Sequence, residues 1–271
     1  MGLSRRTLGR GALVLLLFVL AALASYRGWG WLGRIGSDAP LPQGQAAGIV
    51  SKANSIELPA PSSSRVVILG ASYALGWKLD TAAGLRVMNN GMAGQQSFEM
   101  AERFDRDVLA HAPRAVILWG FINDVFRAPR ADIETALAKA RDSYTMMIAK
   151  GRAAGLDVIL ATEVTITDRS HWMDRLRAFA GRLLGRPGYV DYVNGHVIAM
   201  NAWLREKAQR NGLLLLDFER LLSAPHGHRR PEFAVADGSH LTEVAYDALT
   251  QYTAPILERH FRRNADPASV P

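Results

Sequence analysis

Short apolar runs alternate with longer segments of helical periodicity along most of this chain. The first run, residues 66–69, reads Val-Val-Ile-Leu and ends at Gly70. A short continuous apolar run of this kind is typical of a strand that is buried on both faces. Four similar runs follow, at residues 86–88, 115–119, 157–162 and 213–217. The pattern therefore predicts five strands in a mostly parallel sheet.

Helical periodicity fills the segments between and after these runs. The predicted helices cover residues 98–111, 133–154, 197–210 and 242–261. Strands that alternate with helices form right-handed crossovers, which place helices on both faces of the sheet. We therefore expect an α/β domain over residues 65–263. Its fold class is a flavodoxin-like three-layer sandwich around a five-stranded sheet.

The N-terminal 32 residues have the pattern of an export segment. Arg5 and Arg6 lie in a positively charged N-terminal stretch, and residues 11–26 carry no charge. The uncharged run is short for a membrane span, which needs about 20 apolar residues, and its centre matches a signal peptide. Residues 22–24, Ala-Leu-Ala, offer a small-x-small cleavage site. We expect residues 1–32 to be a signal peptide or a membrane anchor. The arginine pair either belongs to a twin-arginine signal or only sets the orientation of the segment in the membrane.

Three further segments lie outside the regular alternation. Residues 33–64 are rich in Gly, Pro, Ser and Ala, which indicates a linker. Residues 264–271 are expected to be a frayed tail. Residues 166–194 are longer than an ordinary connection and rich in arginine and aromatic residues, so a helical cap insertion is expected there. Two interpretations of it remain open, a substrate lid and a solvated arginine-rich helix.

Charge and cysteine content exclude several classes of protein. The net charge is +7, but residues 1–50 hold five arginines against one aspartate, and so contribute +4 of it. Only +3 remains for the other 221 residues, which argues against a nucleic-acid-binding protein. The absence of cysteine excludes disulfides, thiolate metal sites and a cysteine nucleophile.

A serine, a histidine and an aspartate stand at positions suited to catalysis. In α/β sheets, ligands bind at the carboxyl ends of the strands. Ser72 follows the first predicted strand, and Asp237 precedes His240 by three residues just before the last helix. A serine nucleophile needs a general base, and histidine suits that task near neutral pH. A carboxylate fixes the tautomer of the histidine and stabilises its protonated form.

Candidate hydrogen-bond donors follow the second and third strands. Gly91 and Gly94 end the segment Asn-Asn-Gly-Met-Ala-Gly, where the backbone can approach a ligand and offer an N–H. Asn123 and Asp124 follow the third strand, and the asparagine can donate its side-chain amide. Preorganised donors of this kind stabilise an oxyanion, and losing one typically slows a reaction about 100- to 1000-fold. We expect Asp124 to hold its loop in place.

Together these four segments resemble the sequence blocks of the SGNH (GDSL-type) hydrolase superfamily. The resemblance covers residues 66 to 249. Its blocks are matched by residues 70–72, 89–94, 123–124 and 237–240. The resemblance implies the SGNH hydrolase fold and a serine hydrolase that needs neither a metal nor a cofactor.

The same resemblance implies a role for each matched residue. Ser72 would be the nucleophile, His240 the general base and Asp237 the residue that orients it. The backbone N–H groups of Ser72 and Gly94, with the side chain of Asn123, would form the oxyanion hole. Gly91 and Asp124 would support these groups.

Two positions depart from the family pattern. Ala71 replaces the aspartate that usually precedes the nucleophile, and Phe121 occupies the usual glycine position of the third block. Either the third loop is shifted, with Gly120 one residue early, or Phe121 lines the acyl pocket. Trp77 either contacts substrate or packs over the sheet.

The sequence gives less support to three other candidate site residues. His226 and His228 are expected to be exposed loop residues that bind no metal. Glu163 follows the fourth strand, and the sequence does not decide whether it lines the pocket.

The sequence favours an exported serine esterase of the cell envelope or periplasm, either anchored to the inner membrane or released. The expected substrates are small esters, most plausibly O-acetyl groups on an envelope carbohydrate. Acyl transfer to a polysaccharide by the same three residues is an alternative, as are a lipid esterase and a binding protein without catalysis. The expected partners are an ester substrate and, through residues 1–32, a membrane, with no nucleic acid.

Overall fold

The structure, a computed structural model, describes residues 64–168 and 188–265. These residues belong to one compact unit of the chain, residues 56–271. The strands are β1 (Arg65–Gly70), β2 (Thr81–Ala82), β3 (Leu85–Gly91), β4 (Ala115–Trp119), β5 (Asp157–Ala161) and β6 (Leu214–Leu216). They form one sheet in the order β2-β3-β1-β4-β5-β6. All neighbouring strands are parallel except β2 and β3.

The α/β fold with a mostly parallel sheet is confirmed, but the sheet has six strands rather than five. The additional strand, β2, is only two residues long and pairs antiparallel with β3 at the edge of the sheet. Between the two strands Ala83 and Gly84 have φ of 52° and 76°, so they form a tight turn. A strand of two residues is too short to show a period in the sequence, which explains why it was not predicted.

Helices account for most of the remaining described residues. They are α2 (Ser72–Gly76), α3 (Ser97–Glu102), α4 (Phe104–Asp107), α5 (Ile122–Arg127), α6 (Ile133–Ala153), α8 (Tyr189–Asn211), α9 (Phe218–Leu222) and α10 (Glu243–Ala265). Short 3-10 turns cover Leu109–His111, Arg130–Asp132 and Pro231–Phe233.

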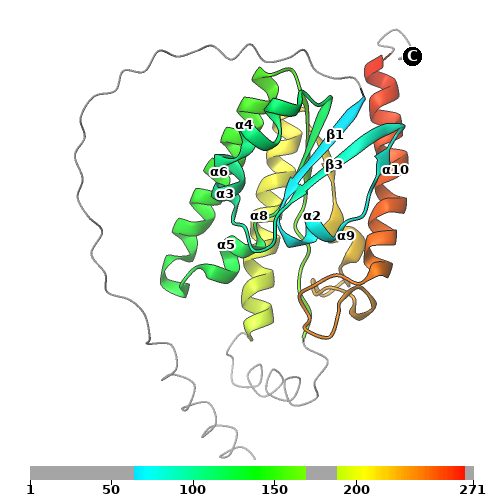
Figure 1. Ribbon diagram of the computed structural model, residues 1–271. Helices are drawn as coiled ribbons and strands as arrows, with labels where there is room; N and C mark the ends of the chain where they lie inside the picture. Colours follow the sequence, from blue (N-terminus) through cyan, green and yellow to red (C-terminus); the bar gives the residue numbers. More distant parts are fainter. Residues whose placement is uncertain (1–63, 169–187, 266–271) are drawn as a thin grey trace, which may run out of the picture. The chain divides into compact units, whose positions relative to one another are not determined.

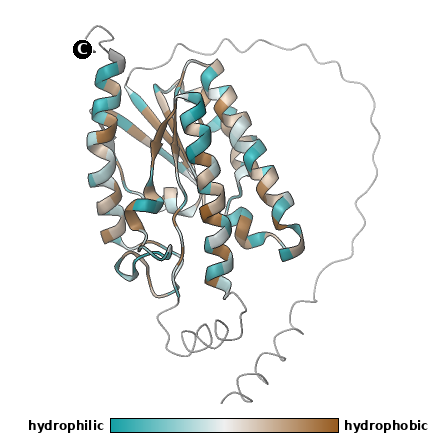
Figure 2. Ribbon diagram, turned by 180° about the vertical axis from the view of Figure 1, so that it is seen from behind, coloured by the Kyte–Doolittle hydropathy of each residue, from teal (hydrophilic) through white to brown (hydrophobic). Residues whose placement is uncertain are grey.

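The helices form the outer layers of a sandwich around the sheet (Figure 1). Figure 1 shows α3, α4, α6 and α8 on one side of the strands and α10 on the other. Strands β1 and β4 lie in the middle and have no exposed residue, as their continuous apolar sequence predicts. Figure 2 shows the hydrophobic colouring of the central strands between the helices.

Two helix boundaries differ from the prediction. The expected helix over 98–111 is three short pieces, because Arg103 has φ −95° and ψ 2° and separates α3 from α4. The expected helix over 197–210 begins earlier, at Tyr189, where Gly188 is the N-cap residue and the Asp191 side chain accepts a hydrogen bond from its N–H at 3.3 Å. The last residues of the expected 166–194 insertion are therefore the first turns of α8.

Several sequence expectations fall outside the described residues. These are the export segment at 1–32, the linker at 33–63, most of the insertion, at 169–187, and the tail from 266. Among the residues that are described, no helix is long and apolar enough to cross a membrane.

Candidate active site

The predicted site residues come together at the carboxyl edge of the sheet. Ser72 is the first residue of α2, directly after β1, and its side chain is half-buried. Gly94 follows β3, and Asn123 lies in the first turn of α5 after β4. The histidine loop, which we define as residues 223–242 between α9 and α10, carries the remaining two candidates. Parallel strands direct the ends of β1, β3 and β4 to the same edge, so their following residues converge.

Asp237 and His240 form a hydrogen-bonded pair. Asp237 Oδ2 lies 2.6 Å from His240 Nδ1, and Asp237 Oδ1 accepts the backbone N–H groups of Ser239 and His240 at 2.8 and 2.9 Å. Partial burial raises the pKa of Asp237, but these hydrogen bonds outweigh it and lower the pKa to about 2. The carboxylate is therefore ionised near neutral pH, and it holds Nδ1 as the protonated nitrogen. This arrangement leaves Nε2 free to accept a proton.

A buried arginine holds the histidine loop against the sheet. Arg229 is only 1% exposed, and its Nη1 donates to the carbonyl oxygens of Ser239 and His240 at 2.7 and 3.0 Å. Its Nε donates to the Thr165 carbonyl at 2.6 Å. The main chain on either side of the imidazole is thus fixed to the segment that follows β5. An irregular loop needs such donors, because its buried carbonyl groups have no ladder partner.

Tyr73 joins the nucleophile turn, which we define as residues 70–76 around the candidate nucleophile Ser72, to the histidine loop. Its hydroxyl donates to the Ser239 carbonyl at 2.6 Å and accepts from Arg229 Nη2 at 3.0 Å. The ring also meets the His240 imidazole edge to face, at 6.4 Å between centroids. Burial raises the pKa of Tyr73 to about 12, so the hydroxyl stays a donor. These contacts place Ser72 and His240 on adjoining segments, although no hydrogen bond joins them within the described residues.

The oxyanion-hole candidates come from three segments, and a hydrogen bond joins two of these segments. The Asn123 Nδ2 donates one of its two hydrogens to the Gln95 carbonyl at 2.9 Å, which connects α5 to the residue after Gly94. Gly94 has φ 75°, a left-handed conformation that favours glycine. Within the described part of the chain, the backbone N–H groups of Ser72 and Gly94 have no hydrogen-bond partner. Those two amides and the second Asn123 hydrogen are therefore available to a ligand oxygen.

Close packing and a second buried arginine fix the nucleophile turn. A Cβ on Gly91 would stand 2.2 Å from the Leu75 nitrogen, so only glycine lets α2 lie against the end of β3. Arg103, which is 5% exposed, donates to the Gly70 carbonyl at 3.0 Å and to the Gln95 side chain at 2.6 Å. Arg103 therefore connects the turn before Ser72 with the loop after Gly94.

Asp124, the residue after Asn123, contacts the start of α3. Its two carboxylate oxygens accept the backbone N–H and the hydroxyl of Ser97 at 2.9 and 2.8 Å. Burial raises the pKa of Asp124 to about 6, although the Ser97 hydrogen bonds oppose that effect. This contact ties α5 to the start of α3.

Glu163 is fully buried and holds the start of α5. One carboxylate oxygen accepts the backbone N–H groups of Phe121 and Ile122 at 3.0 and 3.3 Å, and the other accepts that of Val164 at 3.1 Å. Its own backbone N–H donates to the Asn201 side chain at 2.8 Å. Burial raises the pKa of Glu163 above its usual range, and the hydrogen bonds to the amides oppose this. Glu163 thus fixes the two residues before Asn123 and does not line an open pocket.

The structure also decides the open questions on aromatic residues. Phe121 is fully buried, with its ring 6.5 Å from that of Tyr144, so it belongs to the core. Trp77 is 1% exposed and donates to the Thr250 hydroxyl at 2.9 Å, so it packs over the sheet. His226 is exposed as expected, but the prediction for His228 is wrong, because its side chain is only 12% exposed and its Nε2 lies 2.9 Å from Asp191 Oδ1. Within residues 64–168 and 188–265, no group of three His, Cys, Asp or Glu side chains is placed to hold a metal.

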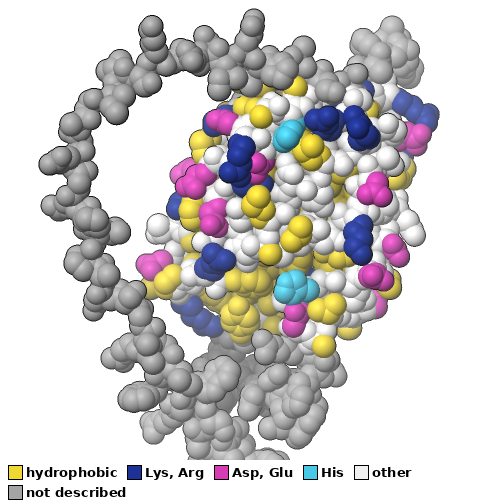
Figure 3. Space-filling model, in the orientation of Figure 1, with side chains coloured by type: hydrophobic (Ala, Val, Ile, Leu, Met, Phe, Trp, Pro, Cys, Tyr) yellow, Lys and Arg dark blue, Asp and Glu magenta, His cyan; other side chains and the backbone are white. Residues whose placement is uncertain are grey.

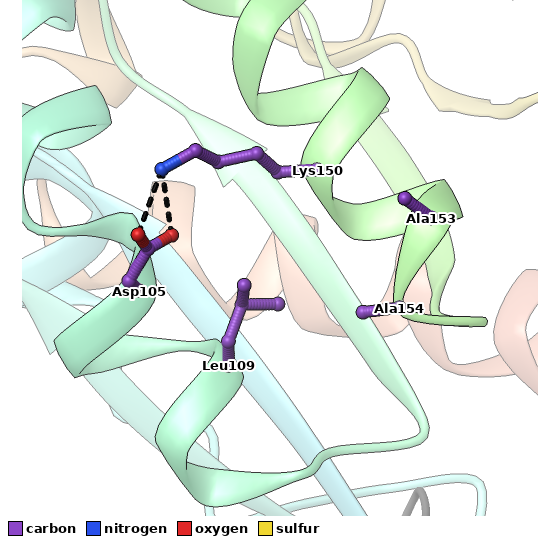
Figure 4. Close-up of a pocket in the computed structure, with 5 residues that line it drawn as sticks. All are labelled: Asp105, Leu109, Lys150, Ala153 and Ala154. Atoms are coloured by element: carbon purple, nitrogen blue, oxygen red, sulfur yellow. Dashed lines mark hydrogen bonds and ion pairs between the residues drawn. The ribbon is translucent and has the colours of Figure 1, made fainter. Parts of the chain in front are cut away.

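A shallow pocket lies near the amino ends of the strands, opposite the carboxyl ends where the candidate site lies. Its lining residues are Asp105, Leu109, Lys150, Ala153 and Ala154 (Figure 4). Lys150 Nζ contacts both Asp105 carboxylate oxygens, at 2.7 and 2.8 Å, and these two charges close one side of it. Because α6 ends here and β5 begins shortly afterwards, the pocket lies near the start of the strands, away from the candidate site.

Sequence reasoning missed both buried arginines. Arg103 lies in a segment of helical periodicity and Arg229 in a polar loop, where arginine is ordinarily exposed. No local pattern separates a buried arginine from an exposed one. A signal did exist for Glu163, because a carboxylate at the end of a buried strand has to find donors.

The model of the GDSL-like lipase/acylhydrolase family matches residues 70–248, which include every candidate site residue. The chain belongs to this family. It is therefore an ester hydrolase by family membership. No curated protein matches the chain.

Solved structures share the fold of this acylhydrolase at low sequence identity. A GDSL-like lipase from Bacteroides thetaiotaomicron is 20% identical, with 73% of this chain and 89% of that chain covered and a TM-score of 0.55. An acetyl xylan esterase, AlAXEase, is 18% identical over 71% of this chain and 99% of its own, also with a TM-score of 0.55. A protein from Bacteroides fragilis assigned as an acylhydrolase is 22% identical over 76% and 93%, again at 0.55.

Proposed function

We propose that this acylhydrolase cleaves small acyl esters, and O-acetyl groups on an envelope carbohydrate in particular. The observation that carries the proposal is the Asp237–His240 pair, with Nδ1 held by the carboxylate at 2.6 Å. That pair lies on the segment that Tyr73 joins to the nucleophile turn. An acetyl xylan esterase among the proteins of similar fold supports an acetyl ester of a carbohydrate as the substrate class.

In the proposed mechanism, Ser72 Oγ attacks the acyl carbon while its proton passes to His240 Nε2. The carbonyl oxygen becomes an oxyanion that the Ser72 and Gly94 amides and the Asn123 side chain stabilise. The bond to the alcohol then breaks, and His240 returns the proton to that alcohol. Water next attacks the acyl-serine, with His240 as the base, and releases the acid and free Ser72. Asp237 stabilises the imidazolium in both steps.

We also propose that the protein acts outside the cytoplasm. The positively charged N-terminal stretch and the uncharged run within residues 1–32 support export, by a cleaved signal or a retained anchor. Mass spectrometry of the mature N-terminus tests this part, because cleavage after Ala24 would remove the segment and an intact start would favour an anchor.

Hydrolysis of p-nitrophenyl acetate, butyrate and octanoate by the full chain tests the activity. Activity on the acetate that falls at least about 1000-fold in Ser72→Ala would support the proposal. A preference for octanoate would contradict the small acyl group. Turnover only when a carbohydrate acceptor is added would contradict hydrolysis and indicate acyl transfer.

A further inference from the structure

The proposed mechanism does not use one guanidinium that lies next to the oxyanion loop, which we define as residues 92–96 between β3 and α3. Arg127 is the last residue of α5, and its side chain is exposed. A Cβ built on Gly94 would stand only 2.9 Å from Arg127 Nη2. The charged group therefore rests against the loop whose amides face the ester oxygen in the proposed mechanism.

Helix geometry explains how Arg127 comes to lie there. Asn123 and Arg127 are four residues apart on α5, and residues at that spacing share one face of a helix. The face of α5 that presents the Asn123 amide to Gln95 therefore also presents a guanidinium to Gly94.

No negative charge in the described residues neutralises this guanidinium. Asp124 is three residues away on the same helix, but its carboxylate is buried and accepts both Ser97 donors. In the described ranges Arg127 forms no ion pair and no hydrogen bond, whereas Arg130, the next arginine, lies over the Tyr192 ring at 4.3 Å. Figure 3 shows basic side chains bordering a hydrophobic surface on the face that α5 occupies in Figure 1.

We infer that Arg127 binds an anionic group of the substrate beside the scissile ester, and that the substrate is an acylated acidic carbohydrate. A guanidinium presents paired N–H donors that match the two oxygens of a carboxylate. The carboxylate of a uronic acid unit that neighbours the acylated sugar has this chemistry. The inference rests on the proposed function and adds the charge of its substrate.

The test compares acetylated polyuronate with acetylated neutral xylan of equal acetyl content. The wild-type full chain should show a higher kcat/KM on the acidic polymer, and added salt should reduce that preference. In Arg127→Gln the ratio of the two kcat/KM values should fall about 10-fold or more, mainly through KM, since hydrogen bonds between charged groups are lost. Arg127→Lys should retain part of the preference.

Arg130→Gln is the matched control, because it removes a neighbouring exposed arginine that stacks on Tyr192. It should leave the ratio unchanged. Equal activity of the wild type on both polymers, or a loss in Arg127→Gln that is the same for both, would overturn the inference. A preference only for an acetyl ester that carries a phosphate would overturn the assignment to a carboxylate.

A binding measurement separates this inference from the proposed function. Ser72→Ala and the double variant Ser72→Ala, Arg127→Gln can each be titrated with acetylated oligouronate and with neutral acetylated oligosaccharide. Tighter binding of the acidic ligand that depends on Arg127 would support the subsite even if the wild type hydrolysed no ester. Equal affinities would refute it even if hydrolysis by Ser72 were established.

Discussion

The nucleophile side of the site and the histidine side are built differently. On the first side, Ser72, Gly94 and Asn123 each lie within four residues of the end of a strand, so the sheet itself sets their positions. On the second side, Asp237 and His240 lie in an irregular loop with no strand of the sheet beneath them. A buried guanidinium, Arg229, replaces the sheet there by binding three carbonyl oxygens.

The two halves should therefore respond differently to substitution. A turn fixed by strand ends retains most of its hydrogen bonds when one side chain is lost. A loop fixed by one cation loses several bonds together, and each buried carbonyl left without a donor costs about 1–3 kcal/mol.

Replacement of the two buried arginines gives the sharpest contrast. Arg229→Met should lower the free energy of unfolding by about 3 kcal/mol or more, because four hydrogen bonds of one buried guanidinium are lost together. The Thr165 carbonyl is then left without a donor among the described residues, whereas the Ser239 and His240 carbonyls keep Tyr73 and the Val235 N–H.

The other buried arginine, Arg103, also pairs with Asp107 at 2.8 Å. Arg103→Met should cost less, since the Gly70 carbonyl keeps the Met92 N–H as a donor and Asp107 keeps its ion pair with Arg106 at 2.6 Å. Urea unfolding of both variants measures the difference. Equal losses would show that the two halves depend on their arginines to the same degree.

Glu163 offers a test of positioning within the nucleophile side. Glu163→Gln should lower kcat about 10- to 100-fold with little change in KM, less than the loss expected for an oxyanion donor itself. If Glu163 acts through Asn123, the same change in an Asn123→Ala background should cost little more, as a double-mutant cycle would show.

Glu219→Gln is the matched control for this cycle. Glu219 is a buried carboxylate that accepts from Asn201 at 2.8 Å and makes no hydrogen bond to α5. Its effect should be additive with Asn123→Ala. Full additivity for Glu163→Gln as well would show a purely structural role.

A fall in pH should change the stability that the two sides contribute in opposite directions. Asp237 has a pKa lowered to about 2, so its contribution to stability is present above pH 4 and is lost as the pH falls toward 2. Asp124 has a pKa raised to about 6, so the folded state binds an extra proton and stability falls as the pH rises from 4 to 6. Melting temperature measured against pH should therefore flatten below pH 4 in Asp237→Asn and between pH 4 and 6 in Asp124→Asn. An unaltered profile in either variant would contradict the assignment.

The link between the two sides should give the smallest effect. Tyr73→Phe removes the hydroxyl that donates to Ser239 and accepts from Arg229. The Ser239 carbonyl keeps Arg229 as a donor, so stability should fall by only about 1 kcal/mol. A loss of activity much larger than this loss of stability would show that Tyr73 also aligns His240 with Ser72.

The fold class could be predicted from the sequence alone, because continuous apolar runs and helical periods alternate over the whole domain. The sequence also identified the candidate catalytic residues, since each follows a strand or precedes the last helix, and their spacing matches one family. The sequence did not predict the two-residue strand β2 or the early start of α8, because neither segment is long enough to show a detectable hydrophobic period.

The contacts that hold these residues in place became visible only in the folded chain. Arg103, Arg229 and Glu163 make their contacts with residues far away in the chain, and such contacts leave no local pattern in the sequence. The same holds for the approach of Arg127 to Gly94, which depends on how α5 lies against the loop after β3. Burial and hydrogen-bond partners are properties of the packed chain, so a residue type and its position along the sequence cannot specify them.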